Sequence, residues 1–304
     1  MKKTLVVVAG PTAVGKTSCG ISLAQALSTE IISADSRQLY KECRIGTAVP
    51  SPEELALVPH HFIQCRPLSA YYNASMFEEE VLERLNQLFR HHNHVLMVGG
   101  SGLYIDAVCQ GIDELPGVDP ELRYELHERL KEEGLDALFS QLQVLDPAIC
   151  ERIDRRNHMR VLKALEVSLQ TGRPYSSFLN QPKKARPFDI VRLALDMERE
   201  QLYERINRRV DQMMEAGLLK EVKALLHLRH HTAMKTVGYR ELFRFLDGKT
   251  SLEEAVDQIR RNTRKYARKQ LTWFRREDRY TWFHPDDIRA MLRYIGKLSP
   301  SASK

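Results

Sequence analysis

The pattern of apolar and polar positions divides the chain into short apolar runs separated by longer stretches with helical periodicity. The apolar runs are residues 5–9, 30–34, 95–98 and 188–195. Their length and composition are typical of buried strands in a parallel sheet, because both faces of such a strand are covered. The stretch at residues 18–27 repeats its apolar side chains with the period of a helix. We therefore predict an α/β fold, with a parallel sheet flanked by helices.

A second texture interrupts this alternation. From Asp113 a turn-rich segment with two prolines and a glycine leads into a charged region. Helical periodicity covers residues 120–133, 135–144 and 157–170. Because loops follow and the run at 188–195 then restores the strand pattern, we predict an all-helical insertion at residues 113–185. The α/β core would then comprise residues 1–112 and 186–304, with several C-terminal helices.

A glycine-rich loop follows the first apolar run. Residues 10–17 read Gly-Pro-Thr-Ala-Val-Gly-Lys-Thr and fit the pattern G-x-x-x-x-G-K-[ST] at every fixed position. Gly10 and Gly15 let the backbone curl so that its N–H groups converge on one anion, and the following helix adds the positive end of its dipole. Lys16 can neutralise an outer phosphate and the Thr17 hydroxyl can hold Mg²⁺. This P-loop predicts phosphate binding, with ATP or GTP only as the default ligand.

Polar residues follow the next two strand signals. Asp35 comes directly after residues 30–34, and Ser101 comes after Gly99-Gly100. Because the carboxyl ends of parallel strands meet at one crevice, we expect both side chains beside the P-loop. A carboxylate there is a candidate proton acceptor. The alternatives are structural, since Asp35 could cap a turn and Ser101 could cap a helix.

The most basic segment lies on the last long helix, which Ser251-Leu252-Glu253-Glu254 opens as a capping box. Between Arg260 and Arg279 there are nine Lys or Arg residues and only two acids. Helical spacing gathers six cations on one half of the helix: Arg260, Arg261, Arg264, Lys265, Arg268 and Lys269. The other half carries Ile259, Tyr266, Gln270, Leu271 and Phe274, with Trp273 near its end. An unmixed positive face favours nucleic-acid or phosphate binding over a merely solvated surface.

Composition agrees with a polyanionic partner without requiring one. The 304 residues carry a net charge of +6, with a pI near 9.0, and are 43% hydrophobic and 28% charged, as in ordinary globular proteins. No apolar run is long enough to span a membrane, and the N-terminus lacks a signal-peptide pattern. Scattered cysteines without C-x-x-C predict a reduced cytoplasmic protein, and the histidine clusters lack metal-site spacing. We expect Ser299–Lys304 to be disordered.

Taken together, the motifs resemble one family, the bacterial tRNA dimethylallyltransferases (tRNA isopentenyltransferases), from Gly10 to about Arg276. Besides the P-loop, the resemblance rests on Asp-Ser-x-Gln-x-Tyr (35–40), Ile-Gly-Thr-Ala (45–48) before Pro50, Gly-Gly-Ser-Gly-Leu-Tyr (99–104), Arg160 ahead of Ala-Leu-Glu-Val (164–167), Thr-Gly-Arg-Pro (171–174), Arg-Ile-Asn-x-Arg-Val-Asp (205–211), Val-Gly-Tyr-Arg-Glu (237–241), and Asn-Thr-Arg (262–264) with Lys-Gln-Leu-Thr-Trp-Phe (269–274). Blocks in this order are far more specific than the P-loop alone.

The resemblance implies a P-loop NTPase-like core and an insertion that holds the tRNA anticodon stem-loop. It implies transfer of a dimethylallyl group from dimethylallyl diphosphate to N6 of the adenine at tRNA position 37, with release of diphosphate. It further implies Mg²⁺ but no ATP, no membrane association, and a monomeric protein.

The resemblance also assigns roles to residues. Stabilisation of the leaving diphosphate is implied for Gly10, Pro11, Thr12, Ala13, Val14, Gly15, Lys16 and Thr17, with Mg²⁺ at Thr17 and an arginine from Arg205 or Arg209. Asp35 would accept the N6 proton, with Ser101 holding Asp35 or the substrate. Contacts with tRNA are implied for Asp35, Ser36, Arg37, Gln38, Ser101, Arg123, Met159, Arg160, Val161, Leu162, Lys163, Lys235, Thr236, Val237, Gly238, Tyr239, Arg240, Arg264, Arg268 and Lys269.

The chain departs from the family pattern in a few places. Arg37 stands where many relatives carry Met or Ala, Ser101 replaces the commoner Thr, and His158 occupies a position often held by Asp. No Cys/His finger follows the long helix. We therefore expect Arg37 to alter how the adjacent anticodon bases are held, and His158 to alter the contacts around Arg160.

Other readings of the P-loop stay open on the sequence. A small-molecule kinase explains the P-loop and Asp35, but neither the basic helix nor the insertion. A free-nucleotide isopentenyltransferase needs no long basic face. A non-catalytic RNA-binding NTPase would hydrolyse ATP in response to tRNA.

Overall fold

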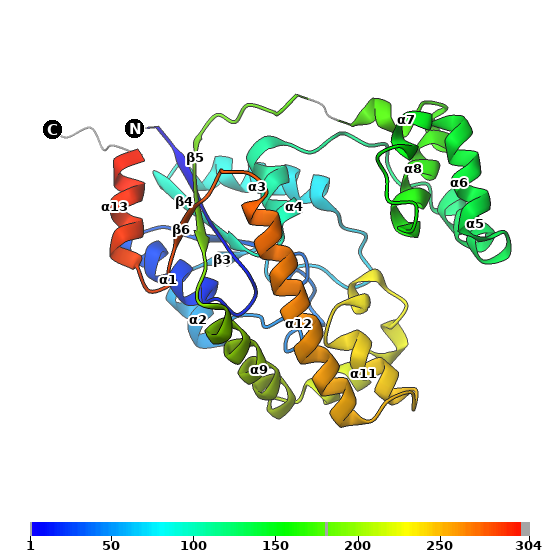
Figure 1. The fold of residues 1–304 in the computed structure, drawn as a ribbon. Coiled ribbons are helices and arrows are strands. Elements are labelled where there is room, and N and C mark those ends of the chain that lie inside the picture. The colour runs from blue at the N-terminus through cyan, green and yellow to red at the C-terminus, as the bar shows by residue number, and fades with distance from the viewer. Residues whose placement is uncertain (1, 180–181, 299–304) are drawn as a thin grey trace. The chain divides into compact units, whose positions relative to one another are not determined.

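The computed structural model describes residues 2–179 and 182–298 (Figure 1). The tail at 299–304, which we expected to be disordered, lies outside the described residues. The chain divides into two compact units, one formed by residues 1–110 with 185–304 and the other by residues 111–184. The boundaries expected from sequence for the inserted segment were 113 and 185.

Within the described residues, the first unit contains a six-stranded sheet in the order β3-β2-β4-β1-β5-β6, and every pair is parallel. The strands are β1 (Thr4–Ala9), β2 (Ile31–Ala34), β3 (His60–His61), β4 (His94–Gly99), β5 (Asp189–Leu195) and β6 (Thr281–Phe283). The predicted α/β fold with a parallel sheet is thus confirmed. The two strands that the pattern missed, β3 and β6, are the short strands at the sheet edges.

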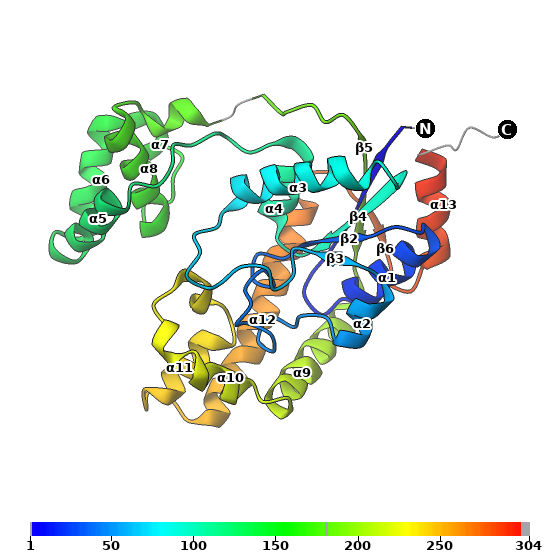
Figure 2. The same cartoon turned by 180° about the vertical axis from the view of Figure 1, so that it is seen from behind.

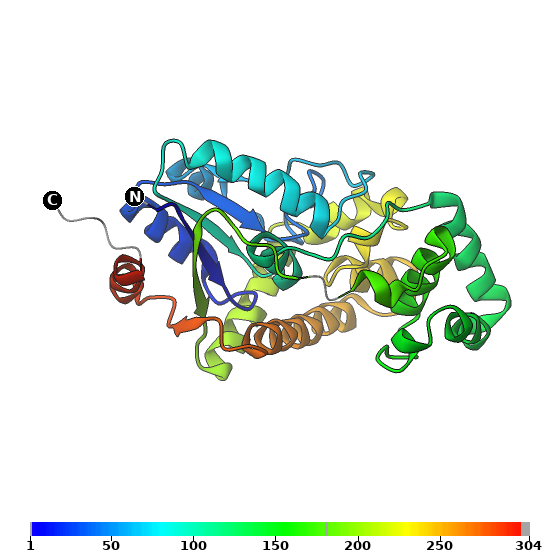
Figure 3. The ribbon, with the colours of Figure 1, turned by 90° about the horizontal axis from the view of Figure 1, so that it is seen from above.

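Helices cover both faces of this sheet, as the alternation along β1 requires. Val6 and Val8 pack in one apolar cluster with α1 (Lys16–Ala26), α9 (Arg199–Glu215) and α13 (Ile288–Leu298). Leu5 and Val7 pack in another with α3 (Ala74–Leu88), which runs along its side of the sheet in Figure 3, and with α4 (Gly102–Gln110). Residues buried on both faces explain why β1 reads as a continuous apolar run.

The register of the central strands brings the predicted site residues together. Ala9 at the end of β1 pairs with Gly99 at the end of β4, and Gly99 pairs in turn with Ala34 at the end of β2. The P-loop, the Ser101 turn and the Asp35 turn therefore leave the sheet side by side. This is the crevice where open parallel sheets bind their ligands.

A helical group borders this crevice in the first unit. It contains α10 (Leu218–Ala224), α11 (Tyr239–Leu246) and α12 (Leu252–Arg275), with short 3₁₀ turns at Leu226–Leu228 and Thr232–Lys235 (Figure 2). Its apolar cluster also takes in Tyr40 and Cys43 from the loop after β2. The expected capping box at Ser251 is confirmed, because its hydroxyl accepts the N–H of Glu254 and the Glu254 carboxylate accepts the N–H of Ser251 at the start of α12. A second capping box, at Ser51, opens α2 (Pro52–Leu57).

The second unit is helical throughout its regular structure. It comprises α5 (Pro120–Glu132), α6 (Gly134–Leu145), α7 (Pro147–Cys150), α8 (His158–Thr171) and a 3₁₀ turn at Tyr175–Phe178. Leu126, Leu142 and Leu165 contribute to its own apolar core. The helices predicted from periodicity are confirmed, whereas the single turn of α7 and the 3₁₀ turn at Tyr175–Phe178 were missed.

No helix in the described part of the chain combines the length and the apolar character that crossing a membrane requires.

Candidate active site

The P-loop has the curled backbone that its glycines allow. Gly10 and Gly15 have backbone φ angles of +152° and +106°, which residues other than glycine rarely adopt. A Cβ on Gly10 would also lie 2.8 Å from the carbonyl oxygen of Leu195. Gly15 then forms the N-cap of α1, so the start of that helix faces the cavity above the loop.

Lys16 and two arginines of α9 gather at this loop. The Lys16 ammonium group donates a hydrogen bond of 2.7 Å to the carbonyl oxygen of Pro11. Arg209 donates to the Thr12 hydroxyl at 3.5 Å, and an Arg205 nitrogen lies 3.3 Å from where a Cβ on Gly15 would be. Burial, followed by the charge of Arg209 and opposed by Asp35, lowers the pKa of Lys16 to about 7. Closely spaced cations of this kind favour an anionic ligand.

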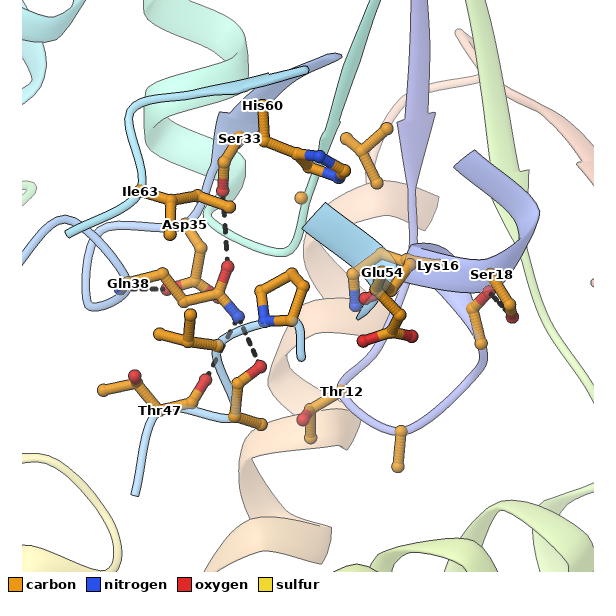
Figure 4. Close-up of a pocket in the computed structure, with 18 of the residues that line it drawn as sticks. Thr12, Lys16, Ser18, Ser33, Asp35, Gln38, Thr47, Glu54, His60 and Ile63 are labelled. Carbon is orange, nitrogen blue, oxygen red and sulfur yellow. Dashed lines mark hydrogen bonds between the residues drawn. The ribbon is translucent and has the colours of Figure 1, made fainter. Parts of the chain in front are cut away.

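Two cavities open at the loop. The first, which we call the phosphate cavity, has a volume of about 360 Å³ and is lined by Lys16, Thr17, Arg205 and Arg209. Figure 4 shows Lys16, Asp35 and the apolar Ile63 among the side chains that surround it. The second, which we call the adjoining cavity, measures about 380 Å³. Its lining is more apolar and includes Val210, Met213, Val237, Ile259 and Tyr266. Both cavities share the side chains of Thr12, Asp35, Thr47, Ala48, Arg209 and Tyr266.

Asp35 lines both cavities, and its side chain also caps the turn that follows β2. Its Oδ1 atom accepts hydrogen bonds from the backbone N–H groups of Arg37 at 2.9 Å and Gln38 at 3.3 Å. Its Oδ2 atom accepts none from the residues that the structure describes. One oxygen therefore fixes the carboxylate while the other is available, so the capping role and a role in proton transfer are compatible.

Ser101 contacts the turn after β2 rather than the carboxylate itself. Its hydroxyl oxygen accepts a hydrogen bond from the backbone N–H of Ser36 at 2.9 Å and donates to the Ser36 hydroxyl at 3.2 Å. Ser101 therefore contacts Ser36 and makes no hydrogen bond to the Asp35 carboxylate within the described residues, and its expected role in holding Asp35 or the substrate stays a prediction. Because Ser36 follows Asp35, the serine pair positions the backbone that carries the carboxylate.

Gln38 was expected to contact tRNA, but its amide nitrogen faces inward. It donates to the carbonyl oxygens of Thr47 at 3.1 Å and Ala48 at 2.8 Å. Ala48 has a φ of +51°, a strained value for a residue with a side chain. Gln38 therefore holds the loop that lines both cavities.

Glu221 of α10 holds the preceding part of the same loop, at residues 44–46. The Glu221 carboxylate accepts hydrogen bonds from the backbone N–H groups of Arg44, Ile45 and Gly46, at 2.8–3.1 Å. It also accepts one from the Tyr239 hydroxyl at 2.7 Å. A Cβ on Gly46 would lie only 2.6 Å from the Tyr239 ring, so the loop approaches α11 as closely as glycine permits.

Several residues expected to contact tRNA are instead buried. Tyr239 is 0% exposed and Gly238 is also buried. In the second unit, Val161 and Leu162 pack in the apolar core, on the inner side of α8. The expectation treated residues 159–163 and 235–240 as continuous contact segments, whereas helical geometry turns part of each segment inward.

The remaining expected tRNA contacts differ in how far their charges are already paired. Met159, Arg160, Lys235, Arg268 and Lys269 are exposed, and so is Arg240, which pairs with the buried Glu241 at 2.6 Å. Arg123 forms a bidentate pair with the buried Glu166, which Lys163 also contacts at 3.3 Å. Arg264 donates to Asn207 at 2.7 Å. Ser36, Arg37, Thr236 and Val237 line the adjoining cavity.

The positive face of α12 is less uniform than its sequence indicates. Arg260 forms ion pairs with Asp211 of α9 at 2.5 Å and with Asp257, one turn earlier, at 2.6 Å. Two acids that lie outside the segment from Arg260 to Arg279 therefore neutralise the charge of Arg260. The exposed Arg261, Lys265, Arg268 and Lys269 keep the face positive.

One residue at the site was not singled out from sequence. Gln270 of α12 is only 6% exposed, and its side-chain oxygen accepts a hydrogen bond from the backbone N–H of Thr12 at 2.8 Å. The Thr12 N–H is thus directed at Gln270, while Thr12 still lines both cavities and its expected role in binding diphosphate stays a prediction. The available signal was a glutamine among apolar positions on the buried half of a helix.

Comparison with known proteins places these features in context. A family model described as IPP transferase matches residues 38–277. The chain is 49% identical over 292 residues to tRNA dimethylallyltransferase 1 of Bacteroides thetaiotaomicron, covering 96% of this chain and 95% of the relative. It is 52% identical over 283 residues to tRNA dimethylallyltransferase 2 of Porphyromonas gingivalis, covering 93% and 94%.

Solved structures agree with this similarity. A tRNA isopentenylpyrophosphate transferase from Bacillus halodurans superposes with a TM-score of 0.72 at 38% identity, over 98% of this chain and 97% of the other. A eukaryotic dimethylallyltransferase acting on tRNA superposes with a TM-score of 0.81 at 25% identity, over 99% and 81%.

Proposed function

The chain belongs to the IPP transferase family and transfers dimethylallyl groups to tRNA, and we propose that it takes the group from dimethylallyl diphosphate and attaches it to N6 of the adenosine at position 37. The observation that carries this proposal is the position of Asp35 where the phosphate cavity meets the adjoining cavity. A donor bound on one side and an adenine on the other would both reach its carboxylate.

The phosphate cavity suits a leaving diphosphate. When the bond between C1 of the dimethylallyl group and the diphosphate oxygen breaks, the electron pair stays on that oxygen and negative charge develops there. Lys16, Arg205 and Arg209 line this cavity, and the start of α1 adds backbone N–H groups. Their positive charge lowers the free energy of the transition state more than that of the bound donor, because more negative charge is exposed there.

Magnesium fits the oxygen donors available at this position. The Thr17 hydroxyl lines the phosphate cavity, and Mg²⁺ is commonly held by one or two protein oxygens together with phosphate oxygens and water. When bound, the ion would neutralise part of the diphosphate charge. Thr17 is the residue that we propose to hold it.

Asp35 would act as the general base on the acceptor. N6 of adenine uses its electron pair to bond with C1 of the dimethylallyl group, and the proton that it loses passes to Oδ2 of Asp35. The hydrogen bonds from Arg37 and Gln38 to Oδ1 keep that second oxygen oriented toward the cavities. Ser101 contributes by holding Ser36 beside it.

Recognition of tRNA requires the adenine to leave the stack of the anticodon loop. The adjoining cavity offers apolar and aromatic side chains, including Tyr266, against which an extruded base can stack. We propose that Arg264, Arg268 and Lys269 of α12 contact the RNA backbone. The second unit would contact the anticodon stem-loop through exposed residues such as Met159 and Arg160.

Transfer of label from the donor tests this function directly. Incubation of the protein with Mg²⁺, dimethylallyl diphosphate labelled in the dimethylallyl group, and an unmodified anticodon stem-loop should label the RNA without any nucleotide. A matched stem-loop with guanosine at position 37 should stay unlabelled. Phosphorylation that depends on ATP, without prenylation, would favour a kinase; labelling of free AMP would favour a free-nucleotide enzyme; ATP hydrolysis stimulated by tRNA would favour an RNA-binding NTPase.

A further inference from the structure

A single side-chain amide connects the last long helix to two of the loops at the active site. Oε1 of Gln270 accepts a hydrogen bond from the backbone N–H of Thr12 at 2.8 Å. Nε2 of the same amide donates to the carbonyl oxygen of Gly100 at 2.9 Å. Gln270 therefore joins the P-loop to the turn after β4, although Thr12 lies 258 positions and Gly100 lies 170 positions before it.

This pair of contacts needs a side chain with both a donor and an acceptor. Thr12 offers an N–H and Gly100 offers a carbonyl, and the terminal amide of glutamine satisfies both at once. Methionine has a similar shape but supplies neither group of comparable strength. Because Gln270 is almost fully buried, replacing it leaves backbone groups without these partners.

The turn after β4 is shaped to admit this amide. A Cβ on Gly100 would lie 2.3 Å from Nε2 of Gln270, and one on Gly102 would lie 2.2 Å from the Trp273 ring. Neither glycine has a positive φ angle. Their common feature is therefore space for α12 rather than an unusual backbone conformation.

Thr12 is consequently fixed from two helices. Gln270 of α12 holds its backbone N–H, while Arg209 of α9 donates to its hydroxyl. These contacts fix the start of a loop whose later residues, Gly15 and Lys16, line the phosphate cavity. A loop that already has its binding conformation loses less entropy when the anion binds.

We propose that Gln270 is a positioning residue for the P-loop, acting through Thr12 so that the loop binds diphosphate in one conformation. Its importance for prenyl transfer rests on the proposed function, but its effect on diphosphate binding does not. Gln270 also lines the phosphate cavity, but its amide oxygen and nitrogen are directed at the backbone of Thr12 and Gly100.

A double-mutant cycle read by diphosphate binding tests this proposal. Gln270→Met removes both hydrogen bonds, and Gly100→Ala displaces the amide without altering Gln270. Calorimetric titration with inorganic diphosphate and Mg²⁺ should show about tenfold weaker binding for each single variant. The double variant should show about the same loss, because all three proteins lack the hydrogen bond between Gln270 and the Thr12 N–H. Thr272→Ala is the matched control, because this exposed residue bonds only within its own helix.

Two further measurements separate positioning from a merely structural role. Thermal unfolding should show that all variants are folded at the temperature of the titration. The KM for dimethylallyl diphosphate should rise with the dissociation constant for diphosphate, whereas tRNA affinity should stay unchanged. A lower unfolding temperature with unchanged diphosphate binding would overturn the proposal, as would a double variant whose loss equals the product of the single losses.

The outcome is also distinct from that of the labelling experiment. If tRNA is not labelled but diphosphate binding depends on Gln270 as described, the proposed function fails and the positioning role stands. If tRNA is labelled and diphosphate binding is indifferent to Gln270, the positioning role fails alone.

Discussion

The Arg209 guanidinium group lies beside the P-loop at Thr12, where its charge acts on Lys16. Burial first, and the charge of Arg209 second, lower the pKa of the Lys16 ammonium group to about 7, and Asp35 opposes this effect only in part. Burial and the neighbouring Arg205 also lower the pKa of Arg209 itself. The site therefore holds positive charges that destabilise one another until an anion stabilises them.

Proton uptake should accompany diphosphate binding above neutral pH. Because the pKa of Lys16 is about 7, the free protein loses this proton as the pH rises through 7, while a bound anion favours the charged ammonium form. Binding should therefore weaken from pH 7 to pH 9 and take up protons at pH 8. Calorimetry in two buffers of different ionisation enthalpy measures the uptake, and Lys16→Met should reduce it to the contribution of the ligand alone. Equal uptake by both proteins would contradict this assignment.

Arg209→Gln should move this pH dependence upward. Removal of the neighbouring cation raises the pKa of Lys16, so proton uptake should begin at a higher pH than in the parent protein. The variant should also bind diphosphate roughly tenfold more weakly, since a charged donor to the site is lost. Arg208→Gln is the matched control, because Arg208 is an exposed residue of the same helix. An unchanged pH profile would show that Arg209 does not act on Lys16.

Asp35→Asn should abolish most turnover without loosening the turn. The amide oxygen still accepts the N–H of Arg37, but the side chain no longer takes up a proton from N6. We expect kcat to fall by about 10²–10⁴-fold, the usual contribution of a general base, with tRNA affinity unchanged. Single-turnover labelling and filter binding measure the two quantities. Comparable losses in both would instead indicate that Asp35 holds the RNA.

The salt dependence of tRNA binding should distinguish free cations of α12 from paired ones. Arg268→Ala and Lys269→Ala should each reduce the slope of log K against log salt concentration by about one, as expected for a lost phosphate contact. Arg260→Ala should change the slope far less, because Asp211 and Asp257 already pair with that charge. Arg264→Ala also loses its bond to Asn207, so its slope is more informative than its affinity. Equal slopes for all variants would argue for a merely solvated helix.

Tyr239→Phe should affect stability rather than direct RNA contact. The variant loses the buried hydrogen bond to Glu221, which should lower the free energy of unfolding by about 1 kcal/mol. Gly46→Ala should cost more, about 1–3 kcal/mol, because its Cβ would overlap the Tyr239 ring. Urea unfolding measures both. A Tyr239→Phe protein with normal stability but weak tRNA binding would instead indicate that the Tyr239 hydroxyl contacts tRNA directly, despite its burial.

What the sequence could predict depends on how local each signal is. The strands β1, β2, β4 and β5 are buried apolar runs, and α12 begins at a capping box, so short windows contain their signals. The two-residue β3 and three-residue β6 have no such window, because pairing with β2 and β5 defines them. The register of the parallel sheet, in turn, explains why Asp35 and Ser101 could be assigned to one crevice.

What the sequence did not reveal are chiefly contacts between side chains that are distant in the sequence. The loop at Gly46 meets Glu221 and Tyr239, and the charge of Arg260 meets Asp211 on another helix. Helical periodicity could have excluded Val161 and Leu162 from the surface of α8, since they lie on its apolar side. No local pattern indicates that Gln270 reaches Thr12.

The distance between Gln270 and Thr12 in the sequence has a consequence for synthesis of the chain. The P-loop is translated early, whereas the residue that holds Thr12 is added 258 positions later. The strands β1, β4 and β5 and the helix α1 all precede α12, so the centre of the sheet is synthesised before Thr12 can receive the contact from α12. On our proposal, diphosphate binding at the P-loop thus depends on the last long helix, which also carries the cations that we propose to contact tRNA.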